Sequence, residues 1–154
     1  MTLRYRYTWS FYPNTWLTEH HATLIFPDDT NLTCTLTAHA SANTWSSWTE
    51  IADSGATTLS SKFAIYEGHI VSVVVESVSE VDTIYMLELS WGSSNSVISR
   101  WRLAGTTKFQ NPSHQLRVRS PHIDAGETIY YRLKSAAAVA NTMLVHFRYY
   151  LHPL

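Results

Sequence analysis

The sequence predicts an all-β protein, and three observations support that prediction. Apolar and polar residues alternate over several short runs, the pattern of strands with one buried face. Thr and Val are frequent, with nine Tyr and six Trp, and these residue types favour strands. No run shows convincing helical spacing. We therefore expect one domain, residues 1–154, folded as an antiparallel β-sandwich of jelly-roll type, with an up-and-down barrel as the alternative.

The two ends of the chain show the clearest alternation. Near the N-terminus the apolar positions are Leu3, Tyr5, Tyr7, Trp9 and Phe11. We expect residues 1–12 to form a strand, as an arm or at a sheet edge. Near the C-terminus, residues 128–134 and 143–151 alternate in the same way, joined by a stretch of small residues. We expect these last two runs to pair as a hairpin, and the N- and C-terminal strands to lie in one sheet.

The middle of the chain adds shorter elements. Strands are predicted over residues 22–26, 32–38, 70–75, 84–91, 97–103 and 116–119. The continuous apolar run at 70–75 is typical of a central strand covered on both faces. Residues 45–52 are expected to be a strand or an irregular extended segment, and residues 55–66 a loop with a short strand. Ser93 to Ser96 is predicted to be a hairpin loop.

The composition excludes several classes of protein. The net charge is −1, so the chain has no nucleic-acid footprint. No apolar run approaches the length of a membrane span, and the first residues do not resemble a signal peptide. Only 15% of residues are charged, against about 25% in a typical domain. That deficit fits a surface covered by other subunits, although a monomer with a Ser/Thr-rich surface fits it equally well.

No catalytic constellation stands out. The chain contains no Gly-x-Ser-x-Gly elbow and no Gly-rich phosphate loop. Cys34, the only cysteine, lies within a strand pattern and is expected to be a buried structural thiol. The glutamates are mostly at predicted turns or strand ends, where solvated carboxylates are ordinary. The eight histidines include no His-x-His pair and are expected to be scattered. We therefore expect no enzyme, metal or cofactor, with a cupin-like metalloenzyme as the least favoured alternative.

Two groups of side chains are candidates for contacts with a partner. Arg100 and Arg102 share one face of a strand, and Arg117 and Arg119 share one face of the next. If these strands pair, the arginines form a basic stripe for a carboxylate-bearing partner; the alternative is a solvated sheet face. Trp45 and Trp48 flank two serines, and Trp91 lies near a strand end. These three residues suggest a sugar-stacking platform or an interface anchor, with core packing as the ordinary alternative.

Three segments together resemble a known group of proteins. They are residues 48–54 (WTEIADS), 68–76 (GHIVSVVVE) and 123–134 (IDAGETIYYRLK). This combination is similar to the capsid decoration, or cement, proteins of tailed bacteriophages, which have a jelly-roll-like β-fold. The likeness covers the C-terminal two-thirds of the chain and leaves out the aromatic N-terminal arm. It implies a non-enzymatic virion protein, often trimeric, that clamps neighbouring capsid subunits.

The resemblance and the composition lead to one main expectation. The protein is expected to be made in the host cytoplasm, to form a homotrimer and to bind the major capsid protein at the surface of the virion. It is not expected to bind nucleic acid or membrane. The residues predicted to make these contacts are Tyr5, Tyr7, Trp9, Trp45, Trp48, Arg100, Arg102, Arg117, Arg119 and Tyr150. The alternative is a glycan-binding or receptor-binding β-sandwich module of a phage tail fibre.

Overall fold

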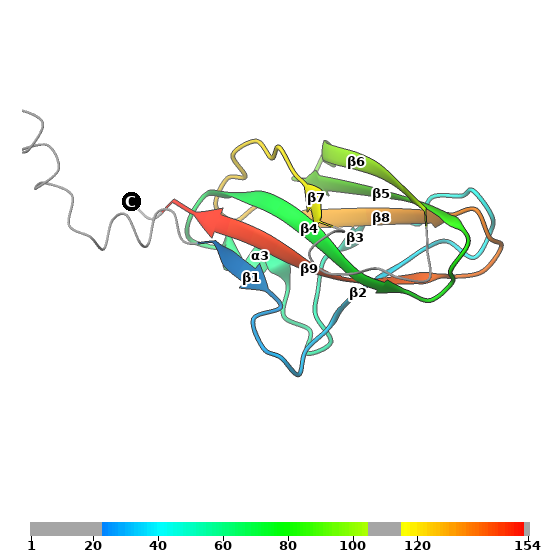
Figure 1. Ribbon diagram of the computed structural model, residues 1–154. Coiled ribbons are helices and arrows are strands. Elements are labelled where there is room, and N and C mark those ends of the chain that lie inside the picture. The colour runs from blue at the N-terminus through cyan, green and yellow to red at the C-terminus, as the bar shows by residue number, and fades with distance from the viewer. Residues whose placement is uncertain (1–22, 105–114, 153–154) are drawn as a thin grey trace, which may run out of the picture.

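The structure is a computed structural model, and it describes residues 23–104 and 115–152 (Figure 1). The described part of the chain is almost entirely β, as the sequence predicted. Its elements are β1 (Leu24–Phe26), β2 (Cys34–Thr37), β3 (Thr49–Glu50), α3 (Leu59–Lys62), β4 (Gly68–Val78), β5 (Ile84–Trp91), β6 (Ser96–Ala104), β7 (Gln115–Arg117), β8 (Ile129–Ser135) and β9 (Thr142–Leu151).

Two antiparallel sheets pack face to face (Figure 1). Sheet A has the order β1-β9-β4-β7, with β2 also paired to β9, and sheet B has the order β3-β8-β5-β6. β1 and β2 pair with consecutive parts of β9, so they are two halves of one strand. Counted this way, the eight strands lie in the orders 1-8-3-6 and 2-7-4-5. This is the strand order of a jelly roll, and it confirms the predicted fold class.

The core lies between the sheets and follows the alternation of the strands. In β8, the side chains of Ile129, Tyr131 and Leu133 are buried, while those of Tyr130 and Arg132 between them face outward. Each fully buried large apolar side chain contributes about 1.5–3 kcal/mol. The largest such side chains come from both sheets and include Phe26, Leu36, Ile70, Phe147, Tyr85, Leu87, Leu89 and Ile129.

The predicted C-terminal hairpin is wrong, although both of its strands exist. β8 lies in sheet B between β3 and β5, and β9 lies in sheet A between β1 and β4. The small-residue stretch after Ser135 therefore crosses from one sheet to the other. Alternation predicts which face of a strand is buried, and it contains no information on which strand lies beside it. The first and last described strands, β1 and β9, do share one sheet. The strand predicted over residues 1–12 lies outside the described residues.

The other elements agree with the sequence predictions, with one exception. Four consecutive residues of β4, Ser72 to Val75, are buried, as expected for a strand covered on both faces. The hairpin loop between β5 and β6 is confirmed. Residues 55–66 contain the short helix α3 in place of a strand. The side chain of Thr58 caps this helix by accepting a hydrogen bond from the Ser61 N–H, and Leu59 and Phe63 pack into the core.

Candidate functional site

The outer face of sheet B is organised around a buried carboxylate. Glu88 lies in the middle of β5 and is 0% exposed. It is directly opposite Arg100 of β6 and Arg132 of β8 in the strand register. Arg100 donates hydrogen bonds to Oε1, one of them from Nε at 2.7 Å, and Arg132 donates to Oε2. Both carboxylate oxygens therefore have a cationic donor, which a buried charge requires.

Two indole rings pack on these cations. The guanidinium carbon of Arg132 lies 4.7 Å from the ring centroid of Trp45 and 4.5 Å from that of Trp48. The ammonium of Lys134 lies 4.8 Å from the Trp45 ring. Cations at these distances are attracted by the electron-rich ring face. Both tryptophans are half-buried, so neither fills the core and neither is fully free in solvent.

We call this surface the basic face of sheet B. Arg102 completes it, since it lies opposite Met86 and thus on the same side of the sheet as Arg100. Glu50, opposite Tyr130, is the second carboxylate on this side. The basic face therefore contains four basic side chains and two acidic ones. Its members are Trp45, Trp48, Glu50, Glu88, Arg100, Arg102, Arg132 and Lys134.

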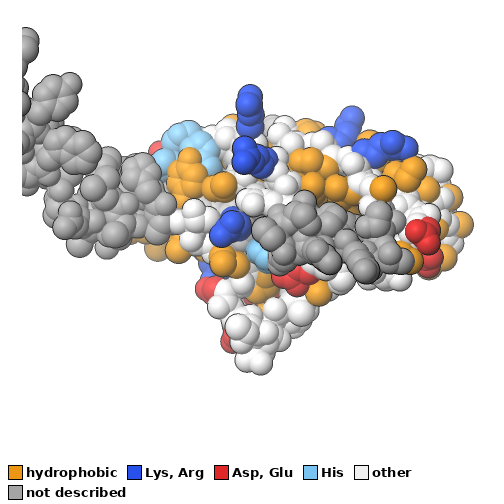
Figure 2. Space-filling model, in the orientation of Figure 1, with side chains coloured by type: hydrophobic (Ala, Val, Ile, Leu, Met, Phe, Trp, Pro, Cys, Tyr) orange, Lys and Arg blue, Asp and Glu red, His pale blue; other side chains and the backbone are white. Residues whose placement is uncertain are grey.

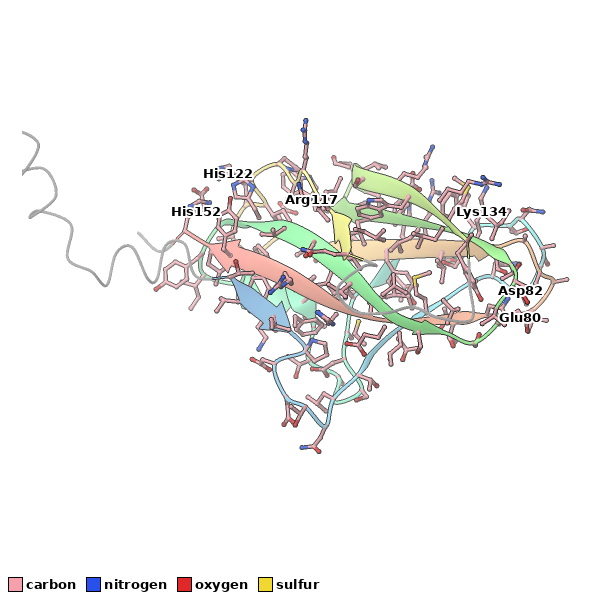
Figure 3. The ribbon with its side chains drawn as sticks, in the orientation of Figure 1. Glu80, Asp82, Arg117, His122, Lys134 and His152 are labelled. Atoms are coloured by element: carbon pink, nitrogen blue, oxygen red, sulfur yellow. The ribbon has the colours of Figure 1, made fainter. Side chains whose placement is uncertain are left out.

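The predicted arginine stripe is wrong in its pairing. Arg117 belongs to β7, which pairs with β4 in sheet A, whereas Arg100 and Arg102 belong to sheet B. Arg119 follows β7 and is exposed. The cations beside Arg100 come instead from β8, two strands away across β5. Figure 3 shows Arg117 and Lys134 on separate strands of the two sheets.

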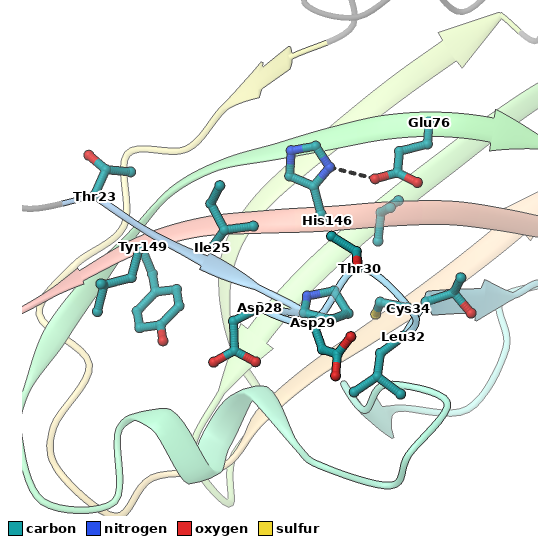
Figure 4. A pocket seen from close by; sticks show the side chains of 14 residues that line it. Thr23, Ile25, Asp28, Asp29, Thr30, Leu32, Cys34, Glu76, His146 and Tyr149 are labelled. Atoms are coloured by element: carbon teal, nitrogen blue, oxygen red, sulfur yellow. Dashed lines mark hydrogen bonds and ion pairs between the residues drawn. The ribbon is translucent and has the colours of Figure 1, made fainter.

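A pocket of about 640 Å³ lies at sheet A beside β1, β9 and the loop after Pro27, and both core-facing and outward-facing residues line it (Figure 4). His146 projects into it, with Nδ1 2.7 Å from Oε1 of Glu76. Asp28 and Asp29 line the opposite wall. Lys62 of α3 binds Asp28 at 3.0 Å and lowers the pKa of that carboxyl group. The pocket therefore combines an imidazole–carboxylate pair with further carboxylates.

Cys34 also lines this pocket, but its chemistry is unsuited to nucleophilic attack. Its side chain is 0% exposed, which confirms the prediction of a buried thiol. Burial, with the nearby charges of Asp53 and Glu76, raises the pKa of Cys34 to about 12. The reactive form of cysteine is the thiolate, and at neutral pH this thiol is protonated. The pocket thus offers no activated sulfur beside the His146 imidazole.

The histidines are not all scattered, contrary to the expectation. His69, His122 and His152 meet on the outer face of sheet A. His20, His21 and His114 lie outside the described residues. Tyr150, a predicted contact residue, packs beside His69 and His152. The other predicted contact residues in the N-terminal arm, Tyr5, Tyr7 and Trp9, are also outside the described part of the chain.

Sequence reasoning missed four residues of the basic face: Glu50, Glu88, Arg132 and Lys134. A signal for Glu88 was present, because a lone carboxylate between Leu87 and Leu89 in mid-strand interrupts an otherwise apolar run. Such a residue is expected to be paired. Its partners could not be found in the same way, since they depend on the register of β5 with two other strands.

Comparison with known proteins adds no family assignment. No protein-family model, no curated protein and no solved structure matches this chain. Within residues 23–104 and 115–152, no helix has the length and apolar character needed to cross a membrane.

Proposed function

We propose that this protein is a non-enzymatic structural component of a virion, a capsid decoration or cement protein that bridges neighbouring subunits of a phage head. Its jelly-roll strand order is also used by viral capsid domains, and three of its segments resemble decoration proteins. A fold is shared by many functions, so the proposal needs a surface to support it. The observation that carries it is the basic face of sheet B.

The basic face has the chemistry of a protein-binding surface. Trp and Arg are the residue types that most often dominate binding energy at interfaces. Here Arg100 and Arg132 are held by Glu88, and Arg132 is also held between two indole rings. Less side-chain freedom is lost when such fixed groups bind. Their charge favours an acidic surface, and we propose that the major capsid protein supplies it.

The proposed mechanism is thermodynamic. A protein that binds the assembled shell, and not its free subunits, stabilises the assembled state by mass action. We propose a homotrimer, because three copies of one modest contact give high avidity when the geometry allows all three to engage. On this proposal the chain is made in the host cytoplasm and functions on the capsid surface, without nucleic acid or membrane as its partner.

The experiment that tests this proposal is co-sedimentation with phage heads stripped of their decoration proteins. The wild-type chain is expected to sediment with the heads, more weakly as salt is raised. Charge reversal at Arg102 and Lys134 (R102E, K134E), neither of which is bound to Glu88, is expected to weaken binding by about tenfold or more. The matched control reverses Arg117 and Arg119 (R117E, R119E) on the other sheet and is expected to bind as the wild type does.

Light scattering coupled to size exclusion at neutral pH measures the oligomer. A trimer that binds stripped heads would support the proposal. A strict monomer with no affinity for heads would overturn it, as would binding of nucleic acid in place of heads.

The glycan-binding alternative depends on two of the same residues, Trp45 and Trp48. Sugar stacking needs an open ring face, and Arg132 lies over one face of each ring. Glycan binding would therefore have to use the opposite face of each half-buried ring. Glycan-array binding that is lost in W48A would favour a receptor-binding module over a cement protein.

A further inference from the structure

Three histidines from distant parts of the sequence meet on the outer face of sheet A, where β4 begins and β9 ends. One ring nitrogen from each of His69, His122 and His152 lies within 4.8 Å of the other two. The ring centroids of His69 and His122 are 4.1 Å apart, and those of His122 and His152 are 4.9 Å apart. Figure 3 shows His122 and His152 side by side at this end of the molecule, and Figure 2 shows the histidine patch at the surface.

The backbone around Gly68 brings these residues together. Gly68 lies opposite Leu151 of β9 on one side and exchanges two backbone hydrogen bonds with Ile123 on the other. The N–H of His152 then donates to the carbonyl of Glu67 at 2.8 Å. A Cβ atom at Gly68 would lie 2.3 Å from the Tyr150 carbonyl oxygen, so only glycine allows the three segments to approach this closely. These backbone contacts therefore determine where the three histidines lie relative to one another.

Two of the rings have a polar neighbour at Nδ1: His69 has a hydrogen-bond partner, and His122 has a carboxylate at ion-pair distance. Nδ1 of His69 lies 3.1 Å from the backbone carbonyl of Ser120. A carbonyl can only accept, so Nδ1 carries the proton and Nε2 has the free lone pair. Nδ1 of His122 lies 3.5 Å from the Glu67 carboxylate, which favours the same tautomer. Carbonyls and carboxylates in these positions are the usual second-layer partners of metal-binding histidines.

We propose that His69, His122 and His152 form a binding site for a divalent transition-metal ion, zinc in the first place. Zinc bonds to imidazole nitrogen at about 2.0–2.1 Å, which places the nitrogens on one ion about 3.3 Å apart. His122 has a side chain that is 54% exposed, so it has room to close on the other two. Three protein ligands leave a fourth position for water, and the bound ion ties the end of β9 to the start of β4.

Titration of the untagged full-length chain with ZnSO₄, after chelator treatment and dialysis, tests this proposal. We expect saturable binding of one zinc ion per chain, with a thermal midpoint that rises with free zinc concentration. Replacement of the exposed His122 (H122Q) is expected to abolish the saturable site and the thermal shift while the circular dichroism spectrum stays unchanged. H39Q, at an exposed histidine outside the cluster, is the matched control and is expected to bind as the wild type does.

Three further measurements test whether zinc binds at this cluster. E67Q retains all three ligands and is expected to weaken binding by about 10–100-fold through His122. The adjacent pair His20 and His21 is tested by H20Q/H21Q, which is expected to leave the stoichiometry unchanged. Cobalt in place of zinc should give the visible absorption of a nitrogen-ligated ion. Absence of saturable binding, binding retained in H122Q, or binding lost in H20Q/H21Q would each overturn the proposal.

Discussion

The outer faces of the two sheets carry their polar groups in different ways. On sheet B a fully buried carboxylate, Glu88, holds two arginines in register across three strands. On sheet A and beside it the pairs are more open: the side chains of His146 and Glu76 are 19% and 39% exposed, and Asp28, in the loop after β1, is exposed beside Lys62 of α3. Loss of one partner from a buried ion pair strongly destabilises the fold, whereas an exposed ion pair contributes little to the free energy of unfolding. Sheet B thus holds its charges in a network around one buried carboxylate, whereas the ion pairs beside sheet A lie closer to solvent.

The strongest test of this comparison removes both partners of Glu88. R100A/R132A leaves a buried carboxylate without a cation, and we expect a loss of about 3–5 kcal/mol in the free energy of unfolding. Urea denaturation monitored by tryptophan fluorescence measures this change.

The control for that variant is R102A, on the same strand and face but opposite Met86. An exposed side chain of this kind is expected to change stability by about 0.5 kcal/mol or less. Equal losses in R102A and R100A/R132A would show that the buried pair is no different from a surface charge.

A smaller loss of stability is expected for G68A, which changes the backbone beneath the histidine cluster of sheet A. G68A places a methyl group against the Tyr150 carbonyl, and we expect the backbone shift to cost about 1–3 kcal/mol. Zinc binding should weaken in the same variant, because the three segments separate. Thermal unfolding and zinc titration of one sample measure both effects.

G55A is the matched control, since a Cβ there meets only side-chain atoms, at 3.3 Å or more. If G68A is less stable but still binds zinc with wild-type affinity, the close approach of the three segments at Gly68 is not what forms the histidine cluster.

The smallest expected effect concerns the pH dependence of stability that two buried groups of sheet A produce. The pKa of Cys34 rises from 9.0 to about 12 on folding, and burial also raises the pKa of Tyr149 to about 12. For groups whose pKa is higher in the folded state, stability is complete below the unfolded pKa and is lost as pH rises toward the folded value. Deprotonation of Cys34 and Tyr149 in the unfolded state should therefore lower the free energy of unfolding by about 1.5–2 kcal/mol between pH 8 and pH 10.

C34A removes the first of these two groups, so its stability should fall less over the same pH range. Parallel pH dependence of the wild type and C34A in urea denaturation would contradict this assignment.

The sequence predicted the strands well and their partners poorly, for a physical reason. Alternation is local, so the buried face of β8 or β9 can be read from a few residues. Pairing depends on distant segments, and both errors of partner, the β8–β9 hairpin and the arginine stripe, arose there. The histidine cluster depends on the same long-range information, since His69 and His122 are far apart in the sequence. α3 was missed because four residues are too few for a helical period to show.

Arg100 and Arg102 also affect the edge of sheet B, because they lie on β6. β6 is the outermost strand of sheet B in the described part of the chain, and it runs for nine residues with Val97 52% exposed. A long open edge is a template on which the strand of another molecule can add, and charged side chains at the edge oppose this addition. Arg100 and Arg102 place two positive charges along this strand, and that charge opposes the addition of a strand from another molecule.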